Sequence, residues 1–166
     1  MEIKMILKHM RYTLVAGACA MLMTAGTAAL AEKKPRGATP ADPQQIIAKY
    51  LGNTWNWSRG GSYWGSGGKF QAVWTNEENQ SKSYADGKWY VTNKGTLCYE
   101  AVWEWKEKNE PDEVRKNCWR HVVDKQGRLW QRHHEKEDWY RPSPEKLSSG
   151  NAIKATYDAH RRIVGQ

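Results

Sequence analysis

Histidine and carboxylate side chains in the C-terminal half are the first candidates for chemistry. His121 and His133 flank the short segment Asp124–Arg128, and Glu135 and Asp138 follow closely. Neighbouring strands would bring the two imidazoles together, and imidazole with carboxylate is a ligand set for zinc. The H-x-x-x-H and H-E-x-x-H spacings of helical metal sites are absent from the sequence. We therefore expect hydrogen-bonded histidines at the rim of a sheet, and a metal site of His121, His133 and Glu135 is the alternative.

Other catalytic patterns are missing from the sequence. No serine lies in a G-x-S-x-G motif. Glu100 and Glu104 would lie about 13 Å apart on one strand, from about 3.3 Å per residue, whereas a glycosidase pair needs about 5 to 9.5 Å. The glycine-rich segment Gly65–Gly68 precedes a strand pattern, so it lacks the helix N-terminus of a phosphate-binding loop. We expect no catalytic residue and no cofactor.

Tryptophan and tyrosine dominate the aromatic composition. The chain has 10 Trp and 8 Tyr beside 1 Phe. Both side chains combine a flat apolar face with a hydrogen-bonding edge, which suits stacking on sugar rings and wet interfaces. Phenylalanine would be sufficient for a dry core. Strand alternation predicts that one group of tryptophans fills a β-core. This group comprises Trp89, Trp103, Trp105, Trp119 and Trp130.

A second aromatic group lies around Ser58–Gly61 and just before the glycine-rich segment. Full burial is harder beside such turns, so these side chains are the candidates for contact with a ligand. The ligand that fits stacking is a glycan, anionic or neutral. The candidate ligand-binding residues are Trp55, Trp57, Arg59, Tyr63 and Trp64.

The first 31 residues have the pattern of a signal peptide. Three basic residues within the first eleven precede an uncharged stretch, Tyr12–Leu30, which ends in Ala29-Leu30-Ala31. We expect cleavage after Ala31 and a periplasmic or secreted protein with no stable membrane insertion after cleavage. An uncleaved anchor is an alternative, since about 19 uncharged residues can just span a bilayer. Acylation of Cys19 is another.

The charge of the chain is basic, with a formal net charge of +8. The expected signal peptide contains three bases and one acid, so the remainder stays basic. Acidic residues are interleaved with the basic ones and no long positive run forms. This balance allows attraction to anionic glycans or lipid head groups. Export argues against a nucleic-acid partner, although Trp, Tyr and Arg are the residues of single-strand binders.

Cysteine use indicates a single disulfide. Of three cysteines, Cys19 leaves with the signal peptide, and Cys98 and Cys118 remain. An even pair in an oxidising compartment predicts a bond between them. It would close a loop of about 20 residues and stabilise the fold by about 3 kcal/mol. Two free buried thiols are the alternative.

The sequence after Gly52 predicts a mainly β fold. Short aromatic and β-branched runs alternate with turn residues about every ten positions, and Asp86-Gly87 is among the hairpin signals. Short connections favour an antiparallel meander that curls into a small barrel or half-barrel. The expected strands are Thr54–Ser58, Ser62–Trp64, Lys69–Thr75, Lys82–Tyr84, Lys88–Thr92, Thr96–Lys106, Cys118–Asp124, Arg128–His133 and Asp138–Arg141.

One short N-terminal helix is expected before the strands. Asp42 supplies a cap residue and Pro43 a first-turn proline, and Gly52 ends the segment. The buried face would hold Ile46, Ile47, Tyr50 and Leu51.

The chain therefore divides into four segments. Three prolines and several charges make the segment after the signal peptide a flexible leader, and the C-terminal residues are polar enough to form a weak helix or none. The expected segments are a signal peptide at 1–31, a flexible leader at 32–43, a β-rich domain at 44–142 and a polar tail at 143–166.

A succession of short motifs runs through the β-rich domain. It consists of Leu51–Trp57, Gly68–Ala72, Tyr84–Thr92, Leu97-Cys98-Tyr99, Cys118–Asp124 and Trp130-Gln131. This order resembles the DUF995 family, small alphaproteobacterial proteins of unknown function that mostly carry signal peptides. The resemblance covers Ile46 to Tyr140. It implies a bacterial, periplasmic or secreted product and a paired role for the two cysteines, but no activity.

These patterns favour an exported, non-enzymatic β-domain. We expect it to bind an envelope or surface polysaccharide, or to support the integrity of the envelope. A metal-dependent or hydrolytic periplasmic enzyme is one alternative. A protein-interaction or inhibitor module, in which exposed aromatic side chains bind another protein, is the other.

Overall fold

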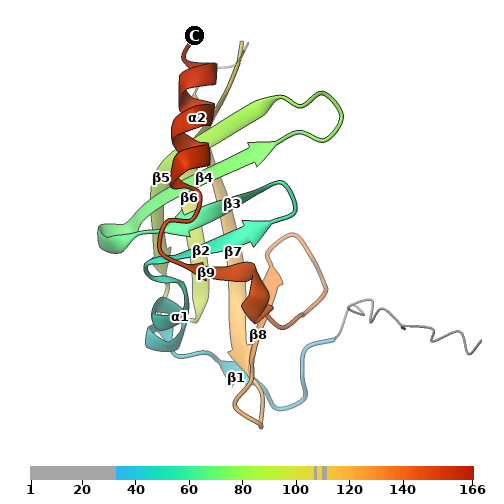
Figure 1. Cartoon of the computed structure of the whole chain (residues 1–166). Helices are drawn as coiled ribbons and strands as arrows, with labels where there is room; N and C mark the ends of the chain where they lie inside the picture. The colour runs from blue at the N-terminus through green and yellow to red at the C-terminus, as the bar shows by residue number, and fades with distance from the viewer. Residues whose placement is uncertain (1–32, 107, 110–111) are drawn as a thin grey trace, which may run out of the picture.

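The computed structural model describes residues 33–166 except 107 and 110–111, and the expected signal peptide lies outside the described residues. Within this part of the chain, nine strands form one antiparallel sheet that curls into a half-barrel (Figure 1). The mainly β prediction is confirmed. The strands are β1 Thr39–Pro40, β2 Asn53–Trp57, β3 Gly60–Trp64, β4 Lys69–Thr75, β5 Lys82–Val91, β6 Thr96–Trp105, β7 Val114–Val123, β8 Leu129–His133 and β9 Leu147–Ser149.

The strand order is that of a meander. From β2 to β7 each strand pairs with the next along the chain, in the order β1-β7-β6-β5-β4-β3-β2-β9, and β8 pairs with β7. Strand β7 begins at Val114, which pairs with Val102, so the connection after β6 is shorter than expected. The expected strand Asp138–Arg141 does not form: Trp139 and Tyr140 are isolated bridge residues, and Tyr140 pairs with Gln131.

The dipeptide Asp86-Gly87 does not form a hairpin turn, so that prediction is wrong. Both residues lie inside the continuous strand β5, where Gly87 pairs with Phe70 of β4 and Ala101 of β6. A Cβ atom on Gly87 would lie 2.1 Å from the carbonyl oxygen of Glu100. Glycine is needed here for the close approach of two strands.

Helix α1 (Pro43–Tyr50) forms as predicted. The Asp42 carboxylate accepts a hydrogen bond from the backbone N–H of Gln44 at 2.8 Å, and Pro43 occupies the first turn. Tyr50 is fully buried, and its ring stacks on that of Trp55 with centroids 5.5 Å apart. Leu51 is exposed instead of buried, because it caps the helix beyond its last turn. We call the face of the sheet that α1 covers the inner face.

Helix α2 (Lys154–Val164) covers the opposite, outer face at β4 and β5 (Figure 1). Tyr157 packs on Val73 and Tyr84, whose strand neighbours point to the inner face. The imidazole Nδ1 of His160 donates a hydrogen bond to the Ser83 carbonyl at 2.9 Å. The short 3-10 turns are Ser66–Gly68 and Pro144–Lys146.

The two flanking segments are more ordered than expected. The expected leader contains β1, which pairs with Val122 and Val123. The expected polar tail contains β9, which extends the sheet beside β2, and α2, whose buried residues are tyrosine and histidine. Long side chains with a single polar tip can be buried once that tip is hydrogen-bonded.

The predicted disulfide between Cys98 and Cys118 is confirmed. The two residues lie directly opposite each other on the neighbouring strands β6 and β7. The bond therefore fixes the register of these two strands.

Candidate ligand-binding site

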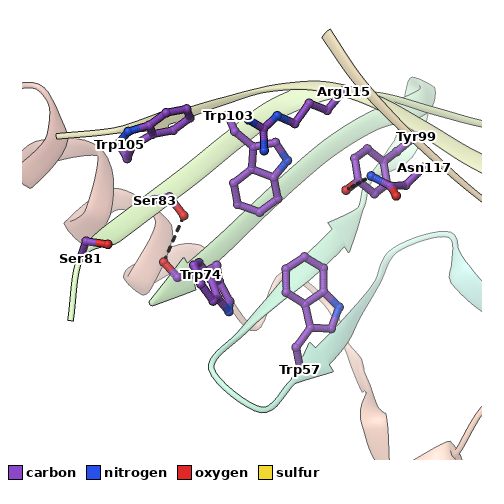
Figure 2. Close-up of a pocket in the computed structure, with 9 residues that line it drawn as sticks. All are labelled: Trp57, Trp74, Ser81, Ser83, Tyr99, Trp103, Trp105, Arg115 and Asn117. Atoms are coloured by element: carbon purple, nitrogen blue, oxygen red, sulfur yellow. Dashed lines mark hydrogen bonds between the residues drawn. The ribbon is translucent and has the colours of Figure 1, made fainter. Parts of the chain in front are cut away.

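An open groove lies on the inner face, beyond the part of the core that α1 covers. It has a volume of about 590 Å³, and side chains of five strands and the connection before β5 line it (Figure 2). We call it the aromatic groove. Its lining residues are Trp57, Trp74, Ser81, Ser83, Tyr99, Trp103, Trp105, Arg115 and Asn117.

Small residues on the paired strands leave room for the groove. Trp103 of β6 lies opposite Ala85 of β5, and Trp105 lies opposite Ser83. Short side chains at these positions leave space above the sheet between the large rings. The groove therefore lies above the part of the inner face that is richest in tryptophan.

Gly60 separates two of the tryptophans. It pairs with Trp57 on one side and with Trp74 on the other. A Cβ atom on Gly60 would lie 2.0 Å from the Val73 carbonyl oxygen, so no larger residue fits without a shift of the strands. The two indoles thus reach the groove from strands that are held close together.

Four indole rings converge on the groove. Trp57 and Trp103 point toward one another from β2 and β6 (Figure 2), with ring centroids 6.3 Å apart and an interplanar angle of 32°. The side chain of Trp74 is 39% exposed. At the rim, the Arg115 guanidinium lies over the Trp105 ring at 5.8 Å. The rings of Trp57, Trp74 and Trp103 are suited to stacking on a flat ligand with an apolar surface.

Polar groups line one end of the groove in a connected series. The His133 imidazole Nε2 donates a hydrogen bond to Asn117 Oδ1 at 2.9 Å, and Asn117 Nδ2 donates to the Tyr99 hydroxyl at 2.9 Å. Burial raises the pKa of Tyr99, although the hydrogen bond from Asn117 opposes this shift. The hydroxyl thus stays neutral, and His133 fixes the orientation of the amide.

Three of the five predicted ligand-binding residues lie away from the groove. Trp64 is 1% exposed and lies in the centre of the core, so it is not the surface residue that we expected. Tyr63, its neighbour on β3, points to the outer face toward α2. Arg59 lies in the turn before β3, where it pairs with Glu77 at 2.9 Å.

The other two predicted residues lie on the inner face. Trp57 lines the aromatic groove, and it also lines a smaller pocket beside it. Trp55 lines only the smaller pocket. Strand alternation explains this distribution: Trp55 and Trp57 are two residues apart and share a face, whereas Tyr63 and its neighbour Trp64 point to opposite faces.

Sequence reasoning missed several groove residues. Trp103 and Trp105 were expected in the core, but they are only half-buried at the end of β6. Trp74, Arg115 and Asn117 were not identified. The signal that could have found them is the register that pairs large rings with Ala85, Ser83 and Gly60, and register is not visible in the sequence.

The alternative metal site is not assembled. His121 has no exposed surface, and its Nδ1 donates a hydrogen bond to the Trp119 carbonyl at 2.9 Å. Its Nε2 lies 3.3 Å from the Tyr50 hydroxyl and 3.1 Å from Gln131 Oε1. Burial lowers the pKa of His121 to about 4. This imidazole is a neutral part of the core.

The other members of the alternative site have separate partners. His133 binds Asn117, and its Nδ1 lies 3.8 Å from a carboxylate oxygen of the exposed Glu135. Asp124, which lies between the two histidines in the sequence, also has partners of its own: its carboxylate accepts hydrogen bonds from the Arg128 and Trp130 side chains at the β7–β8 turn. Among residues 33–166 as described, no group of three or more His, Cys, Asp or Glu side chains is placed to hold a metal ion.

The fold and the groove together define a small antiparallel β-domain with an aromatic site on the inner face of a half-barrel. A family model described as protein of unknown function (DUF995) matches residues 18–157. The chain belongs to this family, as the motif succession indicated. No curated protein and no solved structure matches the chain. In the described residues, no helix has the length and apolar character needed to cross a membrane.

Proposed function

We propose that this protein is an exported domain that binds a polysaccharide of the bacterial envelope or surface in the aromatic groove. The observation that carries the proposal is the convergence of four indole rings on one open groove of the inner face. Sugar rings have apolar faces that stack on such rings and hydroxyl groups that bond to polar rims. Asn117 and the Tyr99 hydroxyl supply that rim.

The proposed location rests on two features. The basic start and uncharged stretch of residues 1–31 have the pattern of a signal peptide. The Cys98–Cys118 disulfide is typical of the periplasm and the cell exterior. An exported domain meets envelope polysaccharides directly.

A titration of the exported protein tests the proposal. Its tryptophan fluorescence would be followed against peptidoglycan fragments, an anionic exopolysaccharide and lipid vesicles, at low and at high salt. Stacking and neutral hydrogen bonds resist screening, so we expect saturable binding of one glycan with little dependence on salt. Equal, salt-sensitive binding to every anion, or binding to vesicles alone, contradicts the proposal.

Variants locate the binding in the groove. Trp103→Ala removes a ring from the groove, and we expect it to weaken glycan binding between about two- and tenfold, the range for one aromatic contact. Tyr90→Ala is the matched control, because this half-buried ring lies on the outer face, where it bonds to Glu100. Calorimetry of both variants distinguishes binding in the groove from nonspecific binding to aromatic residues elsewhere on the protein.

A further inference from the structure

A second, smaller pocket adjoins the aromatic groove. Its volume is about 180 Å³, and Trp57 lines both cavities, so a ligand stacked on Trp57 in the groove lies beside the smaller pocket. We call it the indole pocket. Its lining residues are Trp55, Trp57, Ser62, Trp64, Trp119 and Tyr140.

Two buried polar atoms of the indole pocket are unpaired. Within the described part of the chain, Ser62 Oγ and Trp64 Nε1 have no hydrogen-bond partner. Both residues are 1% exposed, and both line this pocket. Buried polar groups are nearly always hydrogen-bonded, so two unpaired atoms in one pocket indicate a polar group that comes from outside the chain.

Both side chains lie on a strand whose position is fixed by its neighbours. The Trp64 indole is held edge-on by Phe70, with ring centroids 5.1 Å apart, and by Trp89 at 5.9 Å. Ser62 lies in the middle of β3, paired with Trp55 on one side and Ala72 on the other. Alternation on β3 points Ser62 and Trp64 to the same face. Both side chains therefore point to the inner face, where they line the pocket.

The walls of the pocket restrict the chemistry of its ligand. The rings of Trp55, Trp57 and Trp119 form most of the lining, and none of the lining side chains carries a charge. An ionised group would lose its hydration there without a counter-charge. The indole N–H can only donate a hydrogen bond, and the serine hydroxyl can also donate one. An uncharged acceptor oxygen that carries an apolar substituent fits these donors and these walls.

We propose that the indole pocket binds the acetamido group of an N-acetylated sugar. The acetamido carbonyl oxygen accepts hydrogen bonds from Trp64 Nε1 and Ser62 Oγ, and the methyl group packs against the rings of Trp55 and Trp119. The sugar ring stacks on Trp57 at the junction with the groove. This assignment rests on the proposed function and names the class of polysaccharide that the groove takes.

Two matched tetrasaccharides test the assignment. A β-1,4-linked N-acetylglucosamine tetramer and a β-1,4-linked glucose tetramer share a backbone, and they differ only in acetamido against hydroxyl groups. We expect calorimetry with the exported protein to show at least about tenfold tighter binding of the acetylated tetramer, since two hydrogen bonds to buried groups are lost with glucose.

Ser62→Ala is the diagnostic variant. It removes an unpaired hydroxyl without adding bulk, so the melting temperature should stay unchanged while the preference for the acetylated tetramer falls several-fold. Trp64→Phe should also lower the preference for the acetylated tetramer. A melting curve checks that this variant is folded. Ser58→Ala is the matched control, because this exposed serine lies in the turn between β2 and β3.

The outcomes separate this inference from the proposed function. Equal affinity for both tetramers, reduced in Trp103→Ala, overturns the acetamido assignment and supports glycan binding in the groove. A preference that persists in Ser62→Ala and Trp64→Phe also overturns the assignment, since the acetamido group is then recognised elsewhere. Binding of neither tetramer, with binding of no other glycan, overturns both proposals.

Discussion

At the scale of single residues, the environment of His121 makes the fold sensitive to acid. The ring is fully buried, and burial lowers its pKa from 6.5 to about 4. In the unfolded chain the imidazole takes up a proton near pH 6.5, whereas in the folded chain it does so only near pH 4. Between these values the unfolded state binds more protons. Stability is therefore complete above about pH 6.5 and is lost as the pH falls through this window.

We predict that His121 alone lowers the free energy of unfolding by about 3 kcal/mol between pH 7 and pH 4. Urea unfolding at a series of pH values measures this dependence. His121→Gln stays uncharged, so the variant should lose that part of the pH dependence. The pKa of His133 is also lowered by burial, but its contribution is common to both proteins. Identical pH dependence in the two proteins contradicts the account of His121.

The Cys98–Cys118 disulfide is a second feature of individual residues that determines the stability of the fold. Cys98 and Cys118 are 20 residues apart and join neighbouring strands. We expect Cys98→Ser to lower the free energy of unfolding by about 3 kcal/mol, because the unfolded chain gains the freedom of the opened loop. Urea unfolding of the oxidised protein, the reduced protein and the variant makes the comparison. The reduced protein should behave as the variant does, and unchanged unfolding under reducing conditions would refute the prediction.

At the scale of elements, α2 is a structural part of the domain. Tyr157 packs on Val73 and Tyr84, and its hydroxyl donates a hydrogen bond to the Asp86 carboxylate. Burial raises the pKa of Tyr157, and Asp86 adds to this shift. The hydroxyl is thus a stable donor near neutral pH, and it links the helix to β5.

Removal of the Tyr157 ring should loosen α2. We predict that Tyr157→Ala lowers the free energy of unfolding by about 3 kcal/mol, the usual cost of deleting a large buried ring. Ile163→Ala is the control on the same helix: its side chain is 40% exposed, so we expect a change within about 0.5 kcal/mol. Thermal and urea unfolding give both values. Similar small effects of the two substitutions would mean that α2 does not support the fold.

Elements whose signals lie within a few residues of the sequence were predictable, whereas elements that depend on distant partners were not. Helix α1 was predictable because Asp42 and Pro43 are signals that act within one turn. The turn at Asp86-Gly87 was predicted wrongly, because the same glycine serves a close contact with Glu100 on another strand. Helix α2 was underestimated, because its buried face consists of polar-tipped side chains whose partners are distant in the sequence.

At the scale of the whole molecule, the groove depends on how the sheet curls. Tyr99, Trp103 and Trp105 are an even number of residues apart on one strand, so alternation puts them on one face, as the structure does. Alternation does not predict how deeply each side chain is buried. Trp64 is buried because the strands close around it, whereas Trp103 faces a hollow left by Ala85. The type and face of the site residues were thus predictable, but their convergence was not.

The central claim is that the aromatic groove is the glycan-binding surface of the molecule. The backbone and indole N–H signals of ¹⁵N-labelled protein that comprises residues 32–166 can be followed by NMR during titration with the glycan found by fluorescence. Our account predicts saturable shifts of the indole signals of Trp57, Trp74, Trp103 and Trp105, which line the groove. The signals of Trp130 and Trp139, buried in a separate cluster, should stay in place. Shifts confined to Trp130, Trp139 or the outer face would contradict the account.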